Sequence, residues 1–398
     1  MARAGRIDPS EREGSSVASR VLISGSLAGH PVGYGGNTWA FLQYVLGFRR
    51  LGLTTYYIEE LAPGSAVDAE GNRTSFLASA NARYFRDVVD RFALHEHASL
   101  LERDGPAHVG LSRREVERLA PDIDLFVNQF GGLRWLLPKT RRRMYLDLDP
   151  GYTQIWNEHY AVDMGLRDHD VYVTVGLNLG EPDCPLPTAG IRWEKTLPPV
   201  VLDEWVAGPP AGAAYSTVAR WRGFSDIEWG GRWYKQKSSG FGPVLDLPRH
   251  VNVPLELCLD IHAADADAAM LRERGWRIVS PELRAGSADS YRDYLHGSRA
   301  ELAPAKHLYA AGRTGWFSDR TACYLASGRP AVVADTGLAR HLPTGDGLLT
   351  FTDLDSAVAA IQSIERDYER HAEGARQFAR KHLDSDQVLA RLLTLAGM

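Results

Sequence analysis

The most constraining feature of the sequence is a glycine-rich loop that joins a short apolar run to a helical pattern. Residues 21–24 (VLIS) are mostly apolar, the stretch GSLAGHPVGYGGN follows, and residues 38–51 have the apolar spacing of a helix. The helix is expected to end at Gly52, and a second apolar run occupies residues 54–58. A strand, a glycine loop, a helix and a strand in this order predict the start of a parallel α/β domain.

The same alternation continues through the first half of the chain. The pattern predicts helices around residues 82–92 and 112–119, and strands at 123–127, 144–148 and 171–175. Because strand–helix–strand crossovers are right-handed, these strands can join one parallel sheet covered by helices. We therefore expect a Rossmann-like domain.

A second alternation follows a stretch rich in proline and glycine, residues 196–215 (TLPPVVLDEWVAGPPAGAAY). It predicts strands at 216–221, 276–279, 306–310 and 331–334, and helices at 264–274, 287–295 and 319–326. Residues 355–395 are expected to form closing helices. The predicted fold class is α/β, with two tandem Rossmann-like domains that face each other across a cleft.

The expected boundaries follow from these patterns. Residues 1–19 are expected to be a flexible leader, 20–200 a first domain, 201–375 a second domain, and 376–398 a C-terminal helix that packs back on the first domain. A length of 398 residues fits two or three domains.

Composition excludes several classes of protein. The 45 Lys and Arg against 50 Asp and Glu give a net charge of −5, which argues against a nucleic-acid binder. The three cysteines are far apart and form neither a disulfide framework nor a CxxC metal pattern. The polar N-terminus lacks the apolar core of a secretory signal, and no apolar run reaches the roughly 20 residues that cross a bilayer. We expect a cytoplasmic protein without membrane insertion, and a homodimer is left open.

The strongest local motif is GRTGWFSDRTACYLASGRPAVVADTG, residues 312–337. A glycine-bearing loop opens a helix at Ser318 or Asp319, and the free N–H groups and the dipole of this helix end attract phosphate. Arg313 and Arg320 can supply charge-assisted hydrogen bonds to a diphosphate. The alternative is that Ser318 or Asp319 only caps the helix and that the arginines are solvated.

The two-domain plan and this motif resemble the donor half of GT-B glycosyltransferases. Gly315, Trp316 and Ser318 are similar to the donor signature of the plant-type and antibiotic-type branch (family 1), and the spacing from Phe317 and Ser318 to Gly328 matches the retaining, family-4-like branch. The phrases YLDLDPGYTQ and LPTGDGLLTF also resemble uncharacterised bacterial relatives labelled glycosyltransferases. The resemblance implies that the C-terminal domain binds a nucleotide sugar of the UDP, dTDP or GDP type and that the N-terminal domain binds the acceptor.

The resemblance also implies a set of donor-binding residues. Arg313 stands where the inverting branch has a histidine and is the preferred contact, and Arg299 and Lys306 are weaker candidates. Sugar hydroxyls are expected at Asp335, which follows a strand. The full set of expected donor-binding residues is Gly35, Gly36, Arg222, Arg313, Trp316, Phe317, Ser318, Asp319, Arg320, Asp335, Thr336 and Gly337.

One departure from the family pattern concerns the reaction course. The retaining branch has two glutamates eight residues apart, and Gly315 and Cys323 stand at these positions here. The sequence therefore leaves an inverting or a retaining course open.

The expected catalytic residues are His30 and Asp149. His30 lies in the loop after the first strand, where inverting relatives have a general base, and a histidine titrates near neutral pH. The carboxylate that activates it is expected at Asp149, with Glu59 and Asp147 as alternatives. Asp147 and Asp149 lie on one side of a strand, which also suits a divalent cation, but the resemblance implies catalysis without metal.

The sequence thus predicts a hexosyl- or deoxyhexosyltransferase that acts on a hydroxyl or amine of a small-molecule acceptor, natural-product biosynthesis being one setting. The donor is a substrate, and no separate cofactor is expected. Two alternatives stay open: a nucleotide-sugar epimerase of the same fold, and a catalytically degenerate auxiliary protein, which the missing glutamates favour.

Overall fold

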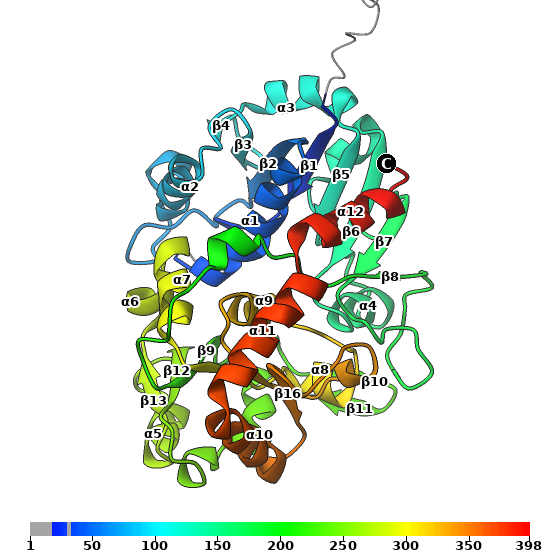
Figure 1. Cartoon of the computed structure of the whole chain (residues 1–398). Helices are drawn as coiled ribbons and strands as arrows, with labels where there is room; N and C mark the ends of the chain where they lie inside the picture. The colour runs from blue at the N-terminus through cyan, green and yellow to red at the C-terminus, as the bar shows by residue number, and fades with distance from the viewer. Residues whose placement is uncertain (1–17, 30–32) are drawn as a thin grey trace, which may run out of the picture.

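The computed structural model describes residues 18–29 and 33–398. Two lobes lie one above the other, each built on a mainly parallel sheet with helices on both faces (Figure 1). The predicted α/β fold with two Rossmann-like domains is confirmed.

The N-terminal lobe contains an eight-stranded sheet in the order β4-β3-β2-β1-β5-β6-β7-β8, in which only β4 is antiparallel to its neighbour. The strands are β1 (Arg20–Ser24), β2 (Thr54–Leu61), β3 (Ala98–Glu102), β4 (His108–Gly110), β5 (Leu125–Gln129), β6 (Arg142–Asp147), β7 (Val171–Thr174) and β8 (Glu194–Lys195). The helices of this lobe are α1 (Gly35–Arg50), α2 (Ala80–Arg91), α3 (Arg113–Leu119) and α4 (Tyr152–Glu158), with 3-10 turns η1 (Phe76–Ala78), η2 (Ala120–Asp122) and η3 (Arg134–Lys139).

The C-terminal lobe contains a six-stranded parallel sheet in the order β13-β12-β9-β14-β15-β16. Its strands are β9 (Tyr215–Arg220), β12 (Leu255–Asp260), β13 (Arg277–Val279), β14 (Ala300–Ala303), β15 (Ala331–Ala334) and β16 (Leu348–Phe351), and a separate hairpin pairs β10 (Ile227–Trp229) with β11 (Arg232–Tyr234). The remaining elements are α5 (Ala266–Glu273), α6 (Pro281–Ala285), α7 (Ala288–Gly297), α8 (His307–Ala311), α9 (Asp319–Ala326), α10 (Leu354–Arg366), η4 (Leu202–Trp205), η5 (Lys237–Val244), η6 (Leu247–Arg249) and η7 (Leu338–Arg340).

One predicted strand is wrong. Residues 306–310 form most of α8, and the strand lies earlier, at β14 (Ala300–Ala303). The cause is Glu301, which interrupts the apolar run but is completely buried inside the sheet because it pairs with Arg320. Pro304 then follows directly after the strand.

Several strands, β3 and β16 among them, were not predicted, and neither was β12, which lies next to β9. Its buried leucines 255, 257 and 259 alternate with Glu256, Cys258 and Asp260, and the two acidic residues hide the apolar signal of a strand.

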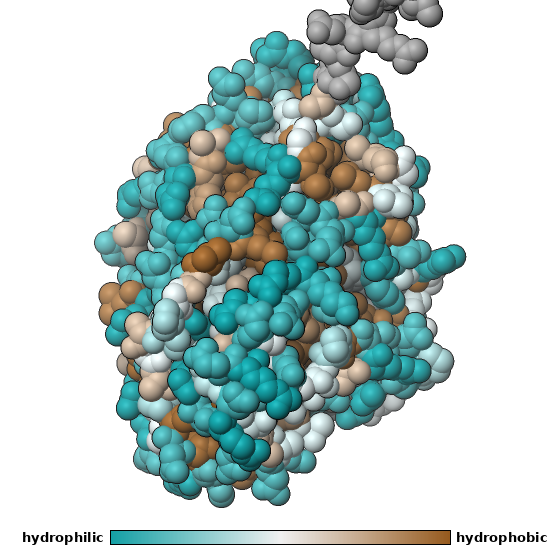
Figure 2. Space-filling model, viewed as in Figure 1, coloured by the Kyte–Doolittle hydropathy of each residue, from teal (hydrophilic) through white to brown (hydrophobic). Residues whose placement is uncertain are grey.

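The chain crosses between the lobes twice. The first crossing, between β8 and β9, contains η4; the second is made by α11 (Tyr368–His382), which lies beside α9, and α12 (Ser385–Leu395), which packs on α1 (Figure 1). The two crossings bind each other, since Val200 N donates to Leu383 O at 2.7 Å and Ser385 N donates to Val200 O at 2.9 Å. Figure 2 shows hydrophilic side chains over most of this face, including the outer side of α11.

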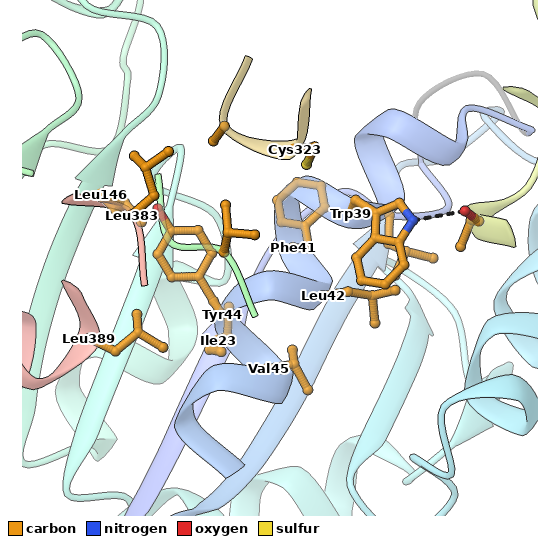
Figure 3. Close-up of a cluster of buried hydrophobic side chains, with 14 of the residues drawn as sticks. Ile23, Trp39, Phe41, Leu42, Tyr44, Val45, Leu146, Cys323, Leu383 and Leu389 are labelled. Carbon is orange, nitrogen blue, oxygen red and sulfur yellow. Dashed lines mark hydrogen bonds between the residues drawn. The ribbon is translucent and has the colours of Figure 1, made fainter. Parts of the chain in front are cut away.

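Helix α1 is the element that both lobes share. It is buried on most sides, as expected of a helix between packed layers, and its aromatic side chains extend from the N-terminal sheet toward α9 of the other lobe (Figure 3). Trp39 Nε1 donates to Ala288 O of α7 at 2.8 Å, and Gln43 lies 3.8 Å from the thiol of Cys323 on α9. The position of α1 therefore fixes one wall of the space between the lobes.

In the described residues, no helix is both long and apolar enough to cross a membrane.

Candidate functional site

A cavity of about 250 Å³ lies between the lobes, at the carboxyl ends of β6 and β14. This is the edge at which open α/β sheets bind ligands. The wall from the N-terminal lobe includes Asn37, Trp39, Ala40, Gln43, Tyr44, Phe130, Leu148, Asp149 and Val175. The wall from the C-terminal lobe includes Lys237, Pro304, Lys306, Tyr309, Trp316, Phe317, Ser318, Asp319, Arg320 and Cys323.

The start of α9 faces this cavity. Ser318 caps the helix, its hydroxyl accepting a hydrogen bond from Arg320 N at 3.2 Å. The Arg320 side chain is held against the wall, because Nε donates to the buried Glu301 at 2.6 Å and Nη1 to Val218 O at 2.8 Å. The helix start predicted from the motif thus lies at the cavity, with a guanidinium fixed beside it.

Lys237 adds an ammonium group to the same cavity. It comes from the start of η5, about 80 residues before α9, and among the described residues its side chain forms no ion pair or hydrogen bond. Burial, together with the positive charges of Arg320 and Lys306, lowers the pKa of Lys237 to about 7. An anion in the cavity would relieve both effects.

Lys306 connects the two lobes across the cavity. Its ammonium donates to Asp149 Oδ1 at 2.6 Å, and Tyr309 Oη donates to the same oxygen at 2.5 Å. The ammonium also lies 3.9 Å from the ring centre of Phe224. Asp149, expected from the sequence as a catalytic carboxylate, therefore lies in the cavity as one half of an ion pair between the lobes.

The two alternative carboxylates, Asp147 and Glu59, accept hydrogen bonds from the protein itself and stabilise the local structure. Asp147 is completely buried and accepts hydrogen bonds from Thr153, Gln154 and Thr174, which fixes the turn that carries Asp149. Glu59 accepts from Tyr57 Oη at 2.9 Å and from the backbone N–H groups of residues 27–29, and so holds the loop after β1. Burial raises the pKa of Glu59 to about 7. His30, the expected base, lies outside the described residues.

The loop before α9 docks on the N-terminal lobe. Asn178 N donates to Thr314 O at 3.0 Å, and Gly176 forms a β-bridge with Trp316. Gly315 has a φ of +68°, and a Cβ there would lie 2.6 Å from Asn178 N. The position at which the retaining branch has its first glutamate is thus filled by backbone of the other lobe, and only glycine fits.

Arg313 lies outside the lining of this cavity. It lines a second hollow, at the ends of β14 and β16, together with Asp335, and its guanidinium lies 3.4 Å from Asp183. Thr336 Oγ1 donates to Trp316 O at 2.8 Å and so supports the loop before α9. Gly337 directly precedes η7 and has a φ of +89°. The donor contacts expected at Arg313 and at residues 335–337 stay predictions.

Three other expected donor contacts also lie outside the cavity lining. Arg222 is paired with Asp265 and Asp267. Gly35 and Gly36 let α1 approach the backbone at residue 287 and the ring of Tyr291, because a Cβ on either glycine would lie within 3 Å of these atoms. A packing role explains both glycines, and their phosphate-binding role stays a prediction.

Some of the remaining expected contacts line the cavity, and others do not. Trp316 and Phe317 line the cavity, where Trp316 stacks on Tyr309 with ring centres 4.5 Å apart. Arg299, which directly precedes β14, pairs with Glu365 and lies outside the cavity lining. No group of three or more His, Cys, Asp and Glu suited to a metal ion occurs in residues 18–29 and 33–398.

No family model and no curated protein matches the chain. Solved structures with the same architecture do match over nearly the full length. An alpha-glucosyltransferase in complex with UDP and a 13-mer DNA has a TM-score of 0.57 at 12% identity, covering 96% of this chain and 100% of its own. Sucrose-phosphate synthase from Thermosynechococcus elongatus has a TM-score of 0.56 at 11% identity, with 95% and 98% covered. HepE from Anabaena, in complex with UDP and glucose, has a TM-score of 0.55 at 13% identity, with 94% and 99% covered.

The fold is GT-B. This confirms the two-domain fold expected from the alternation of strands and helices. In this fold, the cavity lies between the two Rossmann-like domains, and the start of α9 belongs to the C-terminal domain.

Sequence reasoning missed Lys237. It lies in the run WYKQKSSG, which carries no phosphate-binding signature, and only the folded chain brings it next to α9. From the sequence alone, a ligand-binding lysine in such a polar, glycine-containing stretch cannot be distinguished from a lysine that is merely solvated.

Proposed function

We propose that the protein is a glycosyltransferase that binds the diphosphate of a nucleotide-sugar donor in the cavity between the lobes. The observation that carries this proposal is the ammonium of Lys237, which has no ion-pair or hydrogen-bond partner among the described residues and lines the cavity together with Arg320, Lys306 and the start of α9. Arg320 and Lys306 are each paired with a carboxylate, so Lys237 and the helix N-terminus supply the uncompensated positive charge that an anion would neutralise. The GT-B neighbours solved in complex with UDP support a nucleotide as the carrier of that anion.

The proposed roles follow from the positions of the charges. Lys237 and Lys306 neutralise the diphosphate as it departs with the bonding electron pair, which lowers the barrier to transfer. Arg320 is fixed by Glu301 and needs no rearrangement to contribute. Asp149 lies on the opposite wall, where the acceptor would attack, and we propose a small molecule with a hydroxyl or an amine as that acceptor.

An epimerase is the second candidate, because two carboxylates, Asp149 and Asp319, line the cavity. Paired carboxylates suit proton transfer at a sugar ring. The two proposals differ in their need for an acceptor.

One assay separates these functions. UDP-glucose, dTDP-glucose and GDP-mannose are each incubated with the protein, alone and with a panel of phenol, sugar and amine acceptors. The transferase proposal expects acceptor-dependent release of nucleoside diphosphate together with a glycosylated product. A changed sugar that stays attached to the nucleotide, without any acceptor, would favour the epimerase, and no turnover with any donor would support the degenerate protein.

The pKa of Lys237 predicts a pH dependence of donor affinity. Burial and the neighbouring cations lower this pKa to about 7 in the free protein, so Lys237 is already charged below pH 7 and must take up a proton on binding above it. We expect the Kd of the donor to be flat below pH 7 and to rise by up to about tenfold per pH unit above it. Calorimetric titration between pH 6 and 9 measures this, with a sugar nucleotide whose diphosphate does not titrate in the range.

The variant Lys237→Arg is the control for this profile. A guanidinium stays charged throughout the range, so its profile is expected to be flat. An unchanged slope in the variant would show that another group causes it.

A further inference from the structure

The hairpin β10–β11 belongs to the C-terminal lobe but docks on the N-terminal one. Glu228 N donates to the hydroxyl of Tyr160, just beyond the end of α4, at 2.8 Å, and the Glu228 carboxylate lies 3.2 Å from His159 Nε2. Trp229 Nε1 donates to Pro185 O, in the chain between β7 and β8, at 3.0 Å. Figure 1 shows α4 directly above the hairpin.

The chain that enters the hairpin packs on the same helix. The ring centre of Phe224 lies 4.6 Å from that of Tyr152 and 4.9 Å from that of Trp156, both in α4. The segment from Phe224 to Trp229 therefore contacts α4 from its first residue to beyond its last. Helix α4 in turn directly follows the turn that carries Asp149, so this docking fixes a part of the N-terminal lobe that belongs to the site.

The chain that leaves the hairpin leads directly to Lys237. Gln236 N donates to Asp226 Oδ1 at 2.8 Å, and Lys235 N donates to His307 Nδ1 of α8 at 3.0 Å. Both bonds use backbone N–H groups and do not depend on the Lys235 side chain. The base of the hairpin thus fixes the chain immediately before Lys237.

Lys237 is also held on its other side. At Gly240, three residues further along η5, a Cβ would collide with the backbone oxygen of Ala305, so the chain is pressed against the C-terminal lobe there. Lys237 therefore lies in a short stretch between two anchors, and the first of them, the hairpin, is held by the N-terminal lobe. Release of this one anchor should weaken the contact of Lys237 with a ligand without abolishing it.

We propose that the hairpin β10–β11 is a clamp between the lobes that holds Lys237 at the diphosphate of the donor, with Tyr160 and Trp229 as positioning residues. This inference rests on the proposed function. It makes donor affinity depend on a contact outside the cavity, because neither positioning residue lines it. Since docking of the hairpin favours donor binding, donor binding must stabilise the docking by the same free energy.

The first test measures donor affinity by calorimetric titration at pH 6.5, with the best-bound of UDP-glucose, dTDP-glucose and GDP-mannose. Trp229→Ala is expected to weaken binding about three- to tenfold, less than the loss of Lys237 itself because the anchor at Gly240 remains. Tyr160→Phe removes a single hydroxyl, should fold normally, and is expected to weaken binding about two- to threefold.

Trp233→Ala is the matched control. Trp233 is the same residue type in the same hairpin, but it is 56% exposed, and among the described residues its side chain forms no hydrogen bond. This variant should bind the donor within twofold of wild type.

The pH profile separates positioning of Lys237 from general loosening of the protein. In wild type, donor affinity falls above pH 7, because Lys237 must take up a proton. In Trp229→Ala we expect Lys237 to be more hydrated, so that its pKa returns toward the usual value of about 10.4 and the loss relative to wild type shrinks between pH 7 and 9. The variant leaves in place the charged groups around this ammonium, which are Arg320, Lys306, Asp319 and Asp149.

Hydrogen exchange tests the reciprocal effect in the wild-type protein. A saturating concentration of the same sugar nucleotide should slow the exchange of amides in residues 226–236 by at least about threefold. The amides of β13, at the far edge of the C-terminal sheet, should exchange at an unchanged rate.

Four results would overturn the inference while the proposed function stands: wild-type affinity in both Trp229→Ala and Tyr160→Phe, an equal loss in Trp233→Ala, a loss in Trp229→Ala that is the same at every pH, or unchanged exchange in the hairpin. If none of the three sugar nucleotides binds to the wild-type protein, the proposed function itself fails and the inference fails with it.

Discussion

Replacing Lys237 with alanine is expected to weaken nucleotide-sugar binding by about 30- to 150-fold. This corresponds to the loss of one charge-assisted contact of about 2–3 kcal/mol with the diphosphate. The folded protein should not be destabilised, because the ammonium has no partner among the described residues and its removal relieves repulsion from Arg320 and Lys306. Calorimetric titration gives the affinity, and thermal unfolding checks the fold.

Lys235→Ala is the matched control for this variant. Lys235 is only two residues away, but it is exposed, pairs with Asp226 at 3.1 Å and lies outside the cavity. It should bind the donor like wild type. Equal losses in the two variants would indicate a general effect of net charge and contradict the assigned role of Lys237.

Replacing Gly315 with alanine is expected to cost about 3 kcal/mol of unfolding free energy. A Cβ at this position requires a left-handed backbone, at about 1–2 kcal/mol, and it also collides with the backbone N–H of Asn178 in the other lobe. The larger change Gly315→Glu, which restores the residue of the retaining branch, should be worse and should bring no gain in donor affinity. Denaturant unfolding of the purified variants measures the stability.

Gly190→Ala separates strain from collision. Gly190 has nearly the same φ, +69°, but a Cβ there would have no neighbouring atom within 4 Å. Its cost should be about 1 kcal/mol, from backbone strain alone. If both alanine variants lose the same stability, the loop before α9 is not pressed against the N-terminal lobe.

The order of strands and helices could largely be predicted from the sequence, because covered parallel strands give short apolar runs and the helices between them have clear caps. Several strands, β3 and β16 among them, escaped prediction. In β12 and β14, buried or half-buried acidic residues interrupt the apolar runs, and Glu301 is tolerated inside the sheet only through Arg320 on another element. Whether an acidic residue can be buried in a strand depends on partners that are distant in the sequence. A local sequence pattern does not reveal these partners.

The candidate site was predicted only in part. The helix start at Ser318 does face the cavity, since a cap and a glycine loop are local features. The directions of Arg313 and Arg222 depend on tertiary contacts: Arg313 has a left-handed backbone with a φ of +47° and faces Asp183, and Arg222 faces two aspartates. Lys237 comes to the site through the path of the chain around the C-terminal sheet, which no spacing in the sequence encodes.

The central claim is that the cavity between the lobes binds a nucleoside diphosphate at the start of α9, and titration calorimetry with UDP, dTDP and GDP tests it most directly. We predict that at least one of them binds with a Kd below about 1 mM, about −4 kcal/mol or tighter, and that Lys237→Ala removes most of this affinity while Lys235→Ala does not. Absence of binding of all three nucleotides at millimolar concentration, or binding that is indifferent to Lys237, would contradict the account.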